Sequence, residues 1–388
     1  MNNTAIERQE NTPHPENPCP PNAGLYVHVP FCRKKCPYCG FFSVPSPTLI
    51  RPWIDALLKE IPRYRWWPGR FDTLYFGGGT PSLLDIQALE AIMLCLRAHF
   101  PFSLDTEITL EANPCDLTPE KIQGLRRLSI NRISLGVQSF DPRALAFLGR
   151  THTVSDAETA IRRLMDAGFE NLTIDLMYGF REQSLQDWQE TLQRALSFEP
   201  AHLSCYQLTL EPHTCFWKRV HAGRLLPIDE EEACTQFLVT SRFLEAHGYL
   251  HYEISSFARD ERCYARHNWK YWTHAPYLGL GPAAHSFLRG KRWWNVRSVR
   301  RYIHELNAGA PPIAASETLS EKQLALEAMA LGMRTSRGVS LHTIGSGQAN
   351  PHLSRFIDEK FLKIQHGRVL PTRKGFLIAD YLPTCLTA

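Results

Sequence analysis

A repeated unit, in which a short apolar segment is followed by a turn and an amphipathic segment, constrains the fold of this chain most strongly. Most of the apolar segments are near-continuous hydrophobic runs, which are typical of parallel strands covered by helices. Six such units in succession predict an α/β fold whose parallel sheet is open or curved into a partial barrel. In either case we expect functional residues at the carboxyl ends of the strands. The predicted strands are residues 25–29, 72–76, 107–111, 132–136, 172–177 and 202–208.

The starts and ends of several helices can also be predicted from local sequence. Ser155 and Glu158 have the spacing of a capping box, and Gly168 predicts the end of the same helix. Three further starts combine a capping side chain with proline at the first helical position. They are Thr80-Pro81, Thr118-Pro119 and Asp141-Pro142.

The alternation of strands and helices ends near Asp229. The pattern then predicts a helix over 229–247, an aromatic-rich segment over 249–294 and a further helix over 320–335. A glycine-centred turn near the C-terminus joins two short predicted strands. We therefore expect a disordered tail (1–22), a core domain (23–228), an extension of that core (229–315) and a small helical, winged-helix-like domain (316–388).

Composition and charge narrow the class of protein. A net charge of +4 over 388 residues gives no reason to expect binding to nucleic acid. The basic and aromatic run at 291–306 is accordingly interpreted as a solvated helix face with tryptophan anchors. We find no apolar run that predicts a transmembrane helix and no signal-peptide pattern. Together with an odd number of cysteines, 11, these features indicate a cytoplasmic protein with free thiols.

Cys32, Cys36 and Cys39 lie within eight positions directly after the first predicted strand. A structural zinc site normally needs four ligands, and the candidates for a fourth are His28 and the distant Cys263. Three thiolates can instead hold three irons of a [4Fe–4S] cluster and leave the fourth iron open. An open iron can chelate the amino and carboxylate groups of S-adenosylmethionine. The spacing favours the cluster, and zinc remains the alternative.

The segment YVHVPFCRKKCPYC resembles the radical S-adenosylmethionine (radical SAM) superfamily, and more narrowly its branch of coproporphyrinogen dehydrogenase-like proteins. Further similar segments follow in the same order: FGGGTPSLL, EITLEANP, NRISLGVQSFD, FLGRTH, NLTIDLMYGF and PAHLSCYQLTLEP. With later motifs they cover roughly residues 24 to 290. The resemblance implies a radical SAM partial (β/α)6 barrel, a [4Fe–4S] cluster ligated by Cys32, Cys36 and Cys39, and bound S-adenosylmethionine.

The resemblance also implies which residues contact S-adenosylmethionine. Glycines 77–79 follow the second strand, where the absence of side chains lets backbone groups approach a ligand closely. In the family this stretch binds the methionine end of the cofactor. Tyr38, between two cluster ligands, is expected near the adenine. The implied contacts are Tyr26, Tyr38, Gly78, Gly79, Thr80, Glu111, Gln138, Arg150 and Asp175.

Four polar residues in that set lie at or near strand ends. A charge inside an apolar strand, such as Asp175, is costly unless it is paired or bound to a ligand. Arg150 can clamp a carboxylate through two parallel hydrogen bonds. Family analogy assigns these two residues, with Glu111 and Gln138, to the amino, carboxylate and ribose groups of the cofactor. The alternative is a buried ion-pair network in which Arg150 pairs with Asp175 or Glu111.

Position 41 distinguishes two groups within this branch. The coproporphyrinogen dehydrogenases carry a cysteine two positions after the third cluster ligand, whereas this chain has Phe41. They also have a longer N-terminal arm. The chain instead resembles the HemW heme chaperones, whose H-N-x-x-Y-W segment is matched by residues 267–272 and whose following glycine-rich segment is matched by residues 277–286.

The same resemblance implies a heme site. Imidazole is a usual axial ligand of heme iron, and aromatic side chains suit the porphyrin face. His267 is the first candidate for the ligand and His285 the second, while the alternative for His267 is a hydrogen-bonded structural histidine. The candidates for binding the heme propionates are Arg266, Lys270 and the pair Lys291–Arg292.

The leading hypothesis is a heme chaperone that binds a [4Fe–4S] cluster, S-adenosylmethionine and heme. It would deliver heme to acceptor proteins, which family analogy places among respiratory or other membrane-associated proteins. The alternatives are an oxygen-independent coproporphyrinogen III dehydrogenase, a radical SAM heme methyltransferase and a zinc-bearing interaction module. Whether the chain is an enzyme and whether it forms a homodimer stay open, and we assign no catalytic residue.

Overall fold

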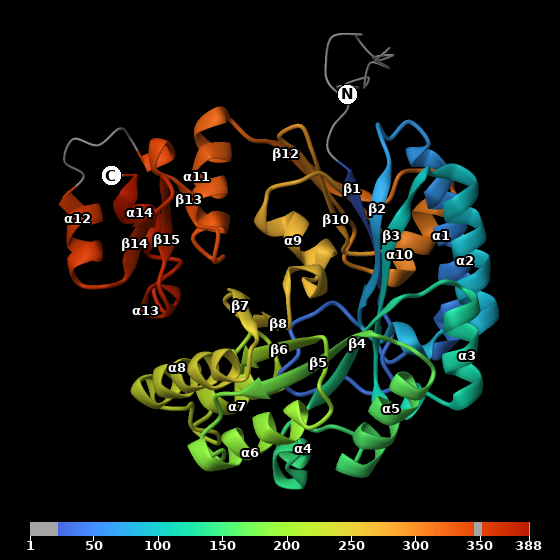
Figure 1. Ribbon diagram of the computed structural model, residues 1–388. Coiled ribbons are helices and arrows are strands. Elements are labelled where there is room, and N and C mark those ends of the chain that lie inside the picture. Colours follow the sequence, from blue (N-terminus) through green and yellow to red (C-terminus); the bar gives the residue numbers. More distant parts are fainter. Residues whose placement is uncertain (1–21, 345–350, 388) are drawn as a thin grey trace.

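The computed structural model of the chain describes residues 22–344 and 351–387 (Figure 1). The predicted tail at 1–22 lies outside the described residues except for its last position. All six predicted strands are confirmed, and consecutive strands pair in parallel. They are β1 (Ala23–Val29), β2 (Phe71–Gly78), β3 (Phe102–Ala112), β4 (Arg132–Gln138), β5 (Asn171–Tyr178) and β6 (His202–Gln207).

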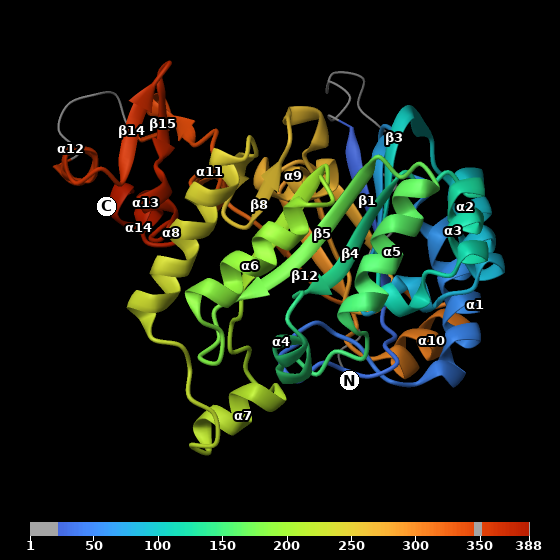
Figure 2. The same cartoon turned by 60° about the horizontal axis from the view of Figure 1, so that its bottom comes forward.

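Helices between these strands cover the outer, convex face of the curved sheet (Figures 1 and 2). Their apolar sides and the outward side chains of the strands form the main core, in which Trp53 and Trp188 are fully buried. Truncating such a buried tryptophan to alanine costs roughly 3–5 kcal/mol. The predicted α/β partial barrel is thus confirmed. The helices are α1 (Ile50–Glu60), α2 (Ile86–His99), α3 (Pro119–Arg127), α4 (Pro142–Phe147), α5 (Val154–Asp166) and α6 (Leu185–Leu196).

Three predicted helix boundaries are confirmed. Thr118 and Asp141 cap α3 and α4 by accepting hydrogen bonds from backbone N–H groups. Gly168 follows the last turn of α5 with a φ of +80°, a left-handed conformation that glycine adopts without steric cost.

Two other predicted boundaries are wrong. The capping box of α5 is formed by Thr153 and Asp156, so this helix begins before Ser155. Thr80 caps no helix, since it is followed only by a short 3-10 turn, and Asp85 caps α2 instead. The Thr80 hydroxyl is used elsewhere, because it donates to the Sγ of Cys32 at 3.5 Å.

The residues after β6 extend the same sheet at both edges. The sheet contains twelve strands in the order β12-β11-β10-β9-β1-β2-β3-β4-β5-β6-β8-β7. In Figure 1, α9 lies on the concave side of this sheet, where it contacts β1 and β2. These elements are α7 (Cys215–His221), α8 (Glu230–Ala246), β7 (Leu250–Glu253), β8 (Ser256–Ala258), α9 (Arg266–Trp272), β9 (Tyr277–Leu280), β10 (His285–Leu288), β11 (Lys291–Asn295), α10 (Val299–Asn307) and β12 (Ile313–Thr318).

The C-terminal section has an apolar cluster of its own, built around Met333 and Val369. Its predicted hairpin is confirmed, with His366 and Gly367 in the turn at φ values of +50° and +70°. The division of the chain into four segments stays a prediction. The elements are α11 (Glu321–Gly332), β13 (Val339–Ser340), α12 (Pro351–Asp358), β14 (Leu362–Gln365), β15 (Arg368–Pro371), α13 (Arg373–Phe376) and α14 (Leu382–Leu386).

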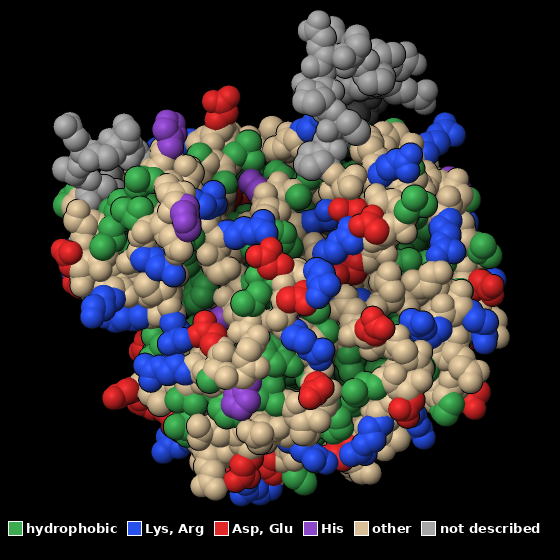
Figure 3. Space-filling view, in the orientation of Figure 1, with side chains coloured by type: hydrophobic (Ala, Val, Ile, Leu, Met, Phe, Trp, Pro, Cys, Tyr) green, Lys and Arg blue, Asp and Glu red, His purple; other side chains and the backbone are tan. Residues whose placement is uncertain are grey.

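The surface carries charges of both signs. Figure 3 shows Lys and Arg side chains interspersed with Asp and Glu over the face that it draws, in keeping with the small net charge. Within the two described ranges, every helix is too short or too polar to cross a membrane.

Candidate functional site

The three clustered cysteines lie on the loop that leaves the carboxyl end of β1, which we call the cluster loop (residues 30–44). All three are free thiols with partial exposure. Burial raises the pKa of the Cys39 thiol, and the neighbouring Cys36 and Cys32 raise it further. Among the described residues, no three His, Cys, Asp or Glu side chains converge tightly enough for one metal ion. A [4Fe–4S] cluster does not need its ligands to converge on one point, because each thiolate binds a separate iron.

The base of the cluster loop is fixed by the protein itself. Cys32 and Val44 are joined through the backbone, with the Cys32 N–H donating to the Val44 carbonyl at 3.2 Å. The Arg33 guanidinium lies 3.0 Å from the carboxylate of Asp116, which also accepts a 2.7 Å hydrogen bond from the Ser82 hydroxyl. The loop is therefore held against the segments that follow β2 and β3.

Neither candidate for a fourth zinc ligand is available at the loop. The two ring nitrogens of His28 lie 3.1 Å from the Tyr26 hydroxyl and 2.8 Å from the Phe42 carbonyl oxygen. The Cys263 carbonyl is 3.4 Å from the guanidinium of Arg132, the first residue of β4, whereas the cluster loop follows the last residue of β1. Because β1 to β4 run in parallel, Cys263 lies at the opposite end of the sheet.

Two carboxylates with raised pKa values face the interior of the partial barrel. Burial raises the pKa of Glu111 to about 7, although its oxygens accept hydrogen bonds from the Tyr75 hydroxyl and the Gly78 N–H at 2.9 and 3.1 Å. Burial likewise raises the pKa of Asp175 to about 6. One oxygen of Asp175 accepts from Ser134 at 2.7 Å, and the other is also buried. Both carboxylates can accept further hydrogen bonds from a cationic group.

Arg150 lies between these carboxylates and the cluster loop. Its guanidinium donates to the Asn113 side chain, to the Gly136 carbonyl at 2.9 Å and to the Sγ of Cys36 at 3.5 Å. Its Nε is buried and has no hydrogen-bond partner among the described residues. No ion pair joins Arg150 to Asp175 or Glu111, so the alternative of a buried ion-pair network between them is wrong.

The glycines after β2 are required by close packing. A Cβ atom at Gly79 would lie 2.5 Å from the backbone oxygen of Phe31, at the entrance to the cluster loop. At Gly78, whose φ is +110°, a Cβ would lie 2.5 Å from the His28 ring. Gln138, at the end of β4, also has a positive φ of +69°, which is uncommon for a residue with a side chain. Such strain is concentrated at functional sites.

Tyr38 belongs to the cluster loop and lies beside α7. Its ring is 6.3 Å from that of Phe216 and packs against a small apolar cluster that includes Leu148 and Phe180. Burial raises its pKa. Tyr26, also predicted at the cofactor, is half-buried on β1 and stacks on Tyr75 at 6.0 Å.

His267, the first candidate for a heme ligand, is only 1% exposed. Its two ring nitrogens lie 2.8 Å from the Thr73 hydroxyl and 2.9 Å from the Tyr271 hydroxyl. The ring stacks on Tyr75 at 5.1 Å, and burial lowers its pKa to about 3. These contacts are those of a structural histidine that fixes α9 against β2, and ligation of iron would require one of the two hydrogen bonds to break.

Three of the four side chains predicted to bind propionates are paired with acids. Lys270 lies 2.6 Å and Arg266 3.6 Å from the carboxylate of Asp72. Arg292 lies 2.5 Å from Glu327 and 3.5 Å from Glu317. Lys291 is exposed.

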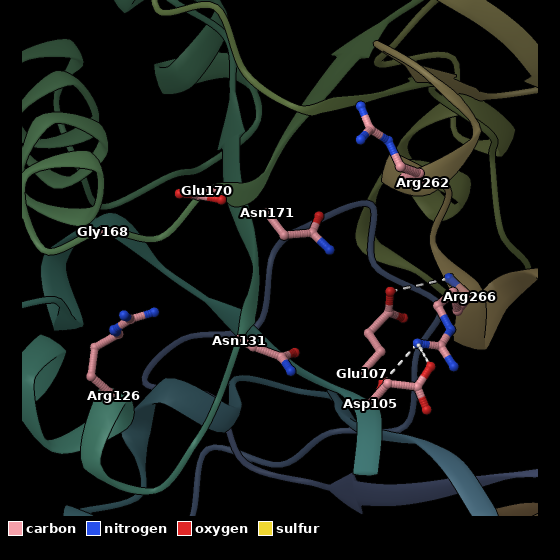
Figure 4. Close-up of a pocket in the computed structure, with 9 residues that line it drawn as sticks. All are labelled: Asp105, Glu107, Arg126, Asn131, Gly168, Glu170, Asn171, Arg262 and Arg266. Atoms are coloured by element: carbon pink, nitrogen blue, oxygen red, sulfur yellow. Dashed lines mark hydrogen bonds and ion pairs between the residues drawn. The ribbon is translucent and has the colours of Figure 1, made fainter. Parts of the chain in front are cut away.

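A polar cavity of about 430 Å³ opens at the other end of the sheet, at the start of β5 and beside β3 (Figure 4). Figure 4 shows Arg266 turned toward Asp105 and Glu107, with which it forms an ion pair and a backbone hydrogen bond. Two further arginines of this cavity are also engaged, since Arg126 packs over the Phe169 ring and Arg262 pairs with Asp260. The three arginines that line this cavity are therefore engaged in contacts within the protein, and the cavity lies away from the cluster loop.

Sequence reasoning did not identify Asn113 or Ser82 as parts of the site. Asn113 holds Arg150, and its own backbone N–H donates to the Ser82 hydroxyl at 3.1 Å. Both residues lie in segments that already indicated the site. Asn113 lies just after β3 in the segment EITLEANP, and Ser82 lies in FGGGTPSLL, shortly after the glycine triplet.

The chain is similar to several known proteins. The family model for the radical SAM superfamily matches residues 26–195. A heme chaperone HemW from Synechocystis is 37% identical over 327 residues, covering 81% of this chain and 78% of the relative. A heme chaperone HemW from Bacillus subtilis is 38% identical over 323 residues, with coverage of 81% and 84%.

Among solved structures, coproporphyrinogen III oxidase (HemN) from Escherichia coli, a radical SAM enzyme, has a TM-score of 0.80 at 21% identity. The match covers 95% of this chain and 90% of that one. At this identity the likeness shows the shared fold alone.

Proposed function

Because the chain belongs to the HemW family of heme chaperones, within the radical SAM superfamily, we propose that it binds heme and passes it to acceptor proteins. The observation that carries this proposal is Phe41, which stands where the related coproporphyrinogen dehydrogenases have a cysteine. Phe41 is 70% exposed, so the position is open to solvent and offers an apolar surface in place of a thiol.

The proposal includes a [4Fe–4S] cluster held by Cys32, Cys36 and Cys39. Two observations support this fit: the loop carrying the thiols is anchored at both ends, and neither His28 nor Cys263 offers a fourth ligand there. When bound, a cluster with one open iron can chelate S-adenosylmethionine and supply it with an electron.

S-adenosylmethionine would lie along the strand ends next to the cluster loop. Arg150 is suited to its carboxylate, since in the described part of the chain its guanidinium has no acidic partner and its buried Nε–H has no acceptor. Glu111 and Asp175 are suited to the amino group or the ribose, as each carries acceptor oxygens in a buried setting. The proposed set of contacts also includes Tyr26, Tyr38, Gly78, Gly79, Thr80 and Gln138.

Further parts of the proposal rest on family membership alone. The acceptors would be heme proteins, including respiratory proteins associated with membranes, and the chaperone would act in the cytoplasm, as a monomer or a homodimer. We assign no radical chemistry to it, and His267 serves to position α9.

The test is a titration of ferric heme into the full chain after anaerobic reconstitution with iron and sulfide. We expect a saturable shift of the Soret band and, on addition of an excess of apomyoglobin, loss of that signal from the chaperone and its appearance on the acceptor. A matched anaerobic reaction with reductant, S-adenosylmethionine and coproporphyrinogen should yield no protoporphyrinogen. Formation of that product, or the absence of saturable heme binding, would overturn the proposal in favour of an enzyme.

A further inference from the structure

A pocket of about 310 Å³ lies between the cluster loop and the turn that leads from β9 into β10. Phe41 and Phe42 line one side, and Tyr277 and His285 line the other. Its volume is at the lower end of the range for small-molecule sites, so a larger flat ligand would keep an edge in solvent.

His285 presents an available imidazole in this pocket. The side chain is exposed, and its ring stacks on that of Trp294 at 5.6 Å with an interplanar angle of 23°. No described residue forms a hydrogen bond with its ring nitrogens. Partial burial and the charges of Arg292 and Arg297 lower its pKa, which favours the neutral form that ligates iron. One lone pair is therefore free to bind a metal.

The other histidines near the pocket lack this freedom. His28 lines the same pocket, but its ring nitrogens are engaged with Tyr26 and Phe42. One ring nitrogen of His267 is hydrogen-bonded to the Tyr271 hydroxyl, and the His267 side chain is almost fully buried. Of the three, His285 alone combines exposure with unused nitrogens.

Arg297 supplies a cation at the edge of the same pocket. Its guanidinium donates to the Gly40 carbonyl at 3.2 Å and lies 5.9 Å from the centre of the Phe42 ring. Within the described part of the chain it forms no ion pair, unlike Arg266, Lys270 and Arg292. It is thus held in place and free to pair with an anionic group.

We propose that this pocket is the heme site, with His285 as the axial ligand of the iron, Arg297 paired with a propionate, and Phe41 and Phe42 against the porphyrin. The inference rests on the proposed heme-binding function and adds the residues that carry it. An unpaired imidazole suits the heme iron, an unpaired guanidinium suits a propionate, and aromatic side chains suit the porphyrin face.

This site would hold heme by one axial ligand and leave the opposite axial position open. An acceptor protein could then bind the heme iron from the open side with a ligand of its own before the bond to His285 breaks. The site also shares a wall with the cluster loop, because Gly40 follows the third cysteine directly.

The test compares His285→Ala with His267→Ala in the full, reconstituted chain titrated with ferric heme. For His285→Ala we expect roughly tenfold or greater loss of affinity and a change in the Soret and electron paramagnetic resonance spectra. Added imidazole should restore the spectrum of the wild-type complex, which a merely structural role of the side chain would not allow. Arg297→Ala should weaken binding by roughly tenfold without changing the spectrum of the bound heme.

The control is His221→Ala, an exposed histidine on α7 outside the pocket, which should bind heme as the wild type does. An unchanged spectrum and affinity in His285→Ala, or a loss confined to His267→Ala, would overturn this inference while leaving the chaperone function intact. If the wild-type chain itself fails to bind heme, the proposed function fails and the inference fails with it.

Discussion

Arg150 and Cys36 are in contact although 114 residues separate them in the chain, with an Nη1–Sγ distance of 3.5 Å. The same guanidinium is held by the Asn113 side chain and by the Gly136 carbonyl. The contact places a fixed cation against one of the three thiols that we assign to the cluster. This contact also joins the cluster loop to the strand ends at which we place S-adenosylmethionine.

Replacing Arg150 by lysine should weaken the binding of S-adenosylmethionine by roughly tenfold or more, because lysine keeps the charge but loses the planar pair of donors. Iron content should be retained, since the three thiols are untouched. Anaerobic calorimetry on reconstituted protein measures the affinity. Arg143→Lys, at an exposed ion pair with Asp141, is the control. Equal affinity in Arg150→Lys and the wild type would remove Arg150 from the cofactor site.

Replacing Cys36 by alanine should abolish the broad iron–sulfur absorption near 400 nm and release the iron, because one of only three available ligands is lost. Cys263→Ala is the matched control and should retain both the absorption and the iron. Iron and sulfide analysis after anaerobic desalting provides the measurement. A chain that binds one zinc ion and needs Cys263 would contradict the cluster assignment.

Glu111 should make the stability of the ligand-free chain depend on pH. Its pKa is raised from 4.5 to about 7 in the folded state, so the folded chain binds this proton more tightly than the unfolded chain does. The stabilisation that this proton contributes is therefore fully present below about pH 4.5 and is lost as the pH rises through about 7. Glu111→Gln, which is neutral throughout, should be more stable than the wild type at pH 8 by roughly 1–3 kcal/mol, and about equally stable near pH 4.

Urea unfolding at both pH values measures this difference. Glu182→Gln, at an exposed position, is the control and should change the free energy of unfolding little. The prediction fails if Glu111→Gln is equally destabilised or stabilised at both values.

Asp116 should be needed for the stability of the cluster loop. Its carboxylate is only 9% exposed and accepts hydrogen bonds from Arg33 and Ser82. Asp116→Ala should lower the free energy of unfolding by roughly 1–3 kcal/mol, because buried partners are left unsatisfied. Asp55→Ala breaks an exposed ion pair with Arg51 and should change little. Similar losses of stability in both variants, measured by urea unfolding, would show that the buried hydrogen bonds of Asp116 stabilise the fold no more than an exposed ion pair does.

The strands and the cluster loop could be predicted because their signals are local. Each strand is an apolar run of the right length, and the three cysteines lie close together in sequence. The boundary at Thr80 could not be predicted in this way. Its hydroxyl binds Cys32, 48 residues earlier, so a side chain that is suited to capping a helix is used in a tertiary contact.

The placement of His267 illustrates the same limit. The sequence puts it in an aromatic-rich segment, which is compatible with a ligand and with a structural residue. Its hydrogen bond to Thr73, 194 residues away, decides where the ring lies, and no local pattern records it. Similarly, the ion pair of Lys270 with Asp72 joins distant segments and removes a cation that the sequence alone presents as free.

The contact between Gly40 and Arg297 spans 257 residues and has a consequence for biosynthesis. A ribosome exposes the three cysteines early, while β9, β10 and Arg297 are still to be translated. The wall opposite the cluster loop is missing from any unfinished chain that stops before these elements. Under our assignment, such a chain carries all three cluster ligands but lacks His285 and Arg297, the residues that would bind heme.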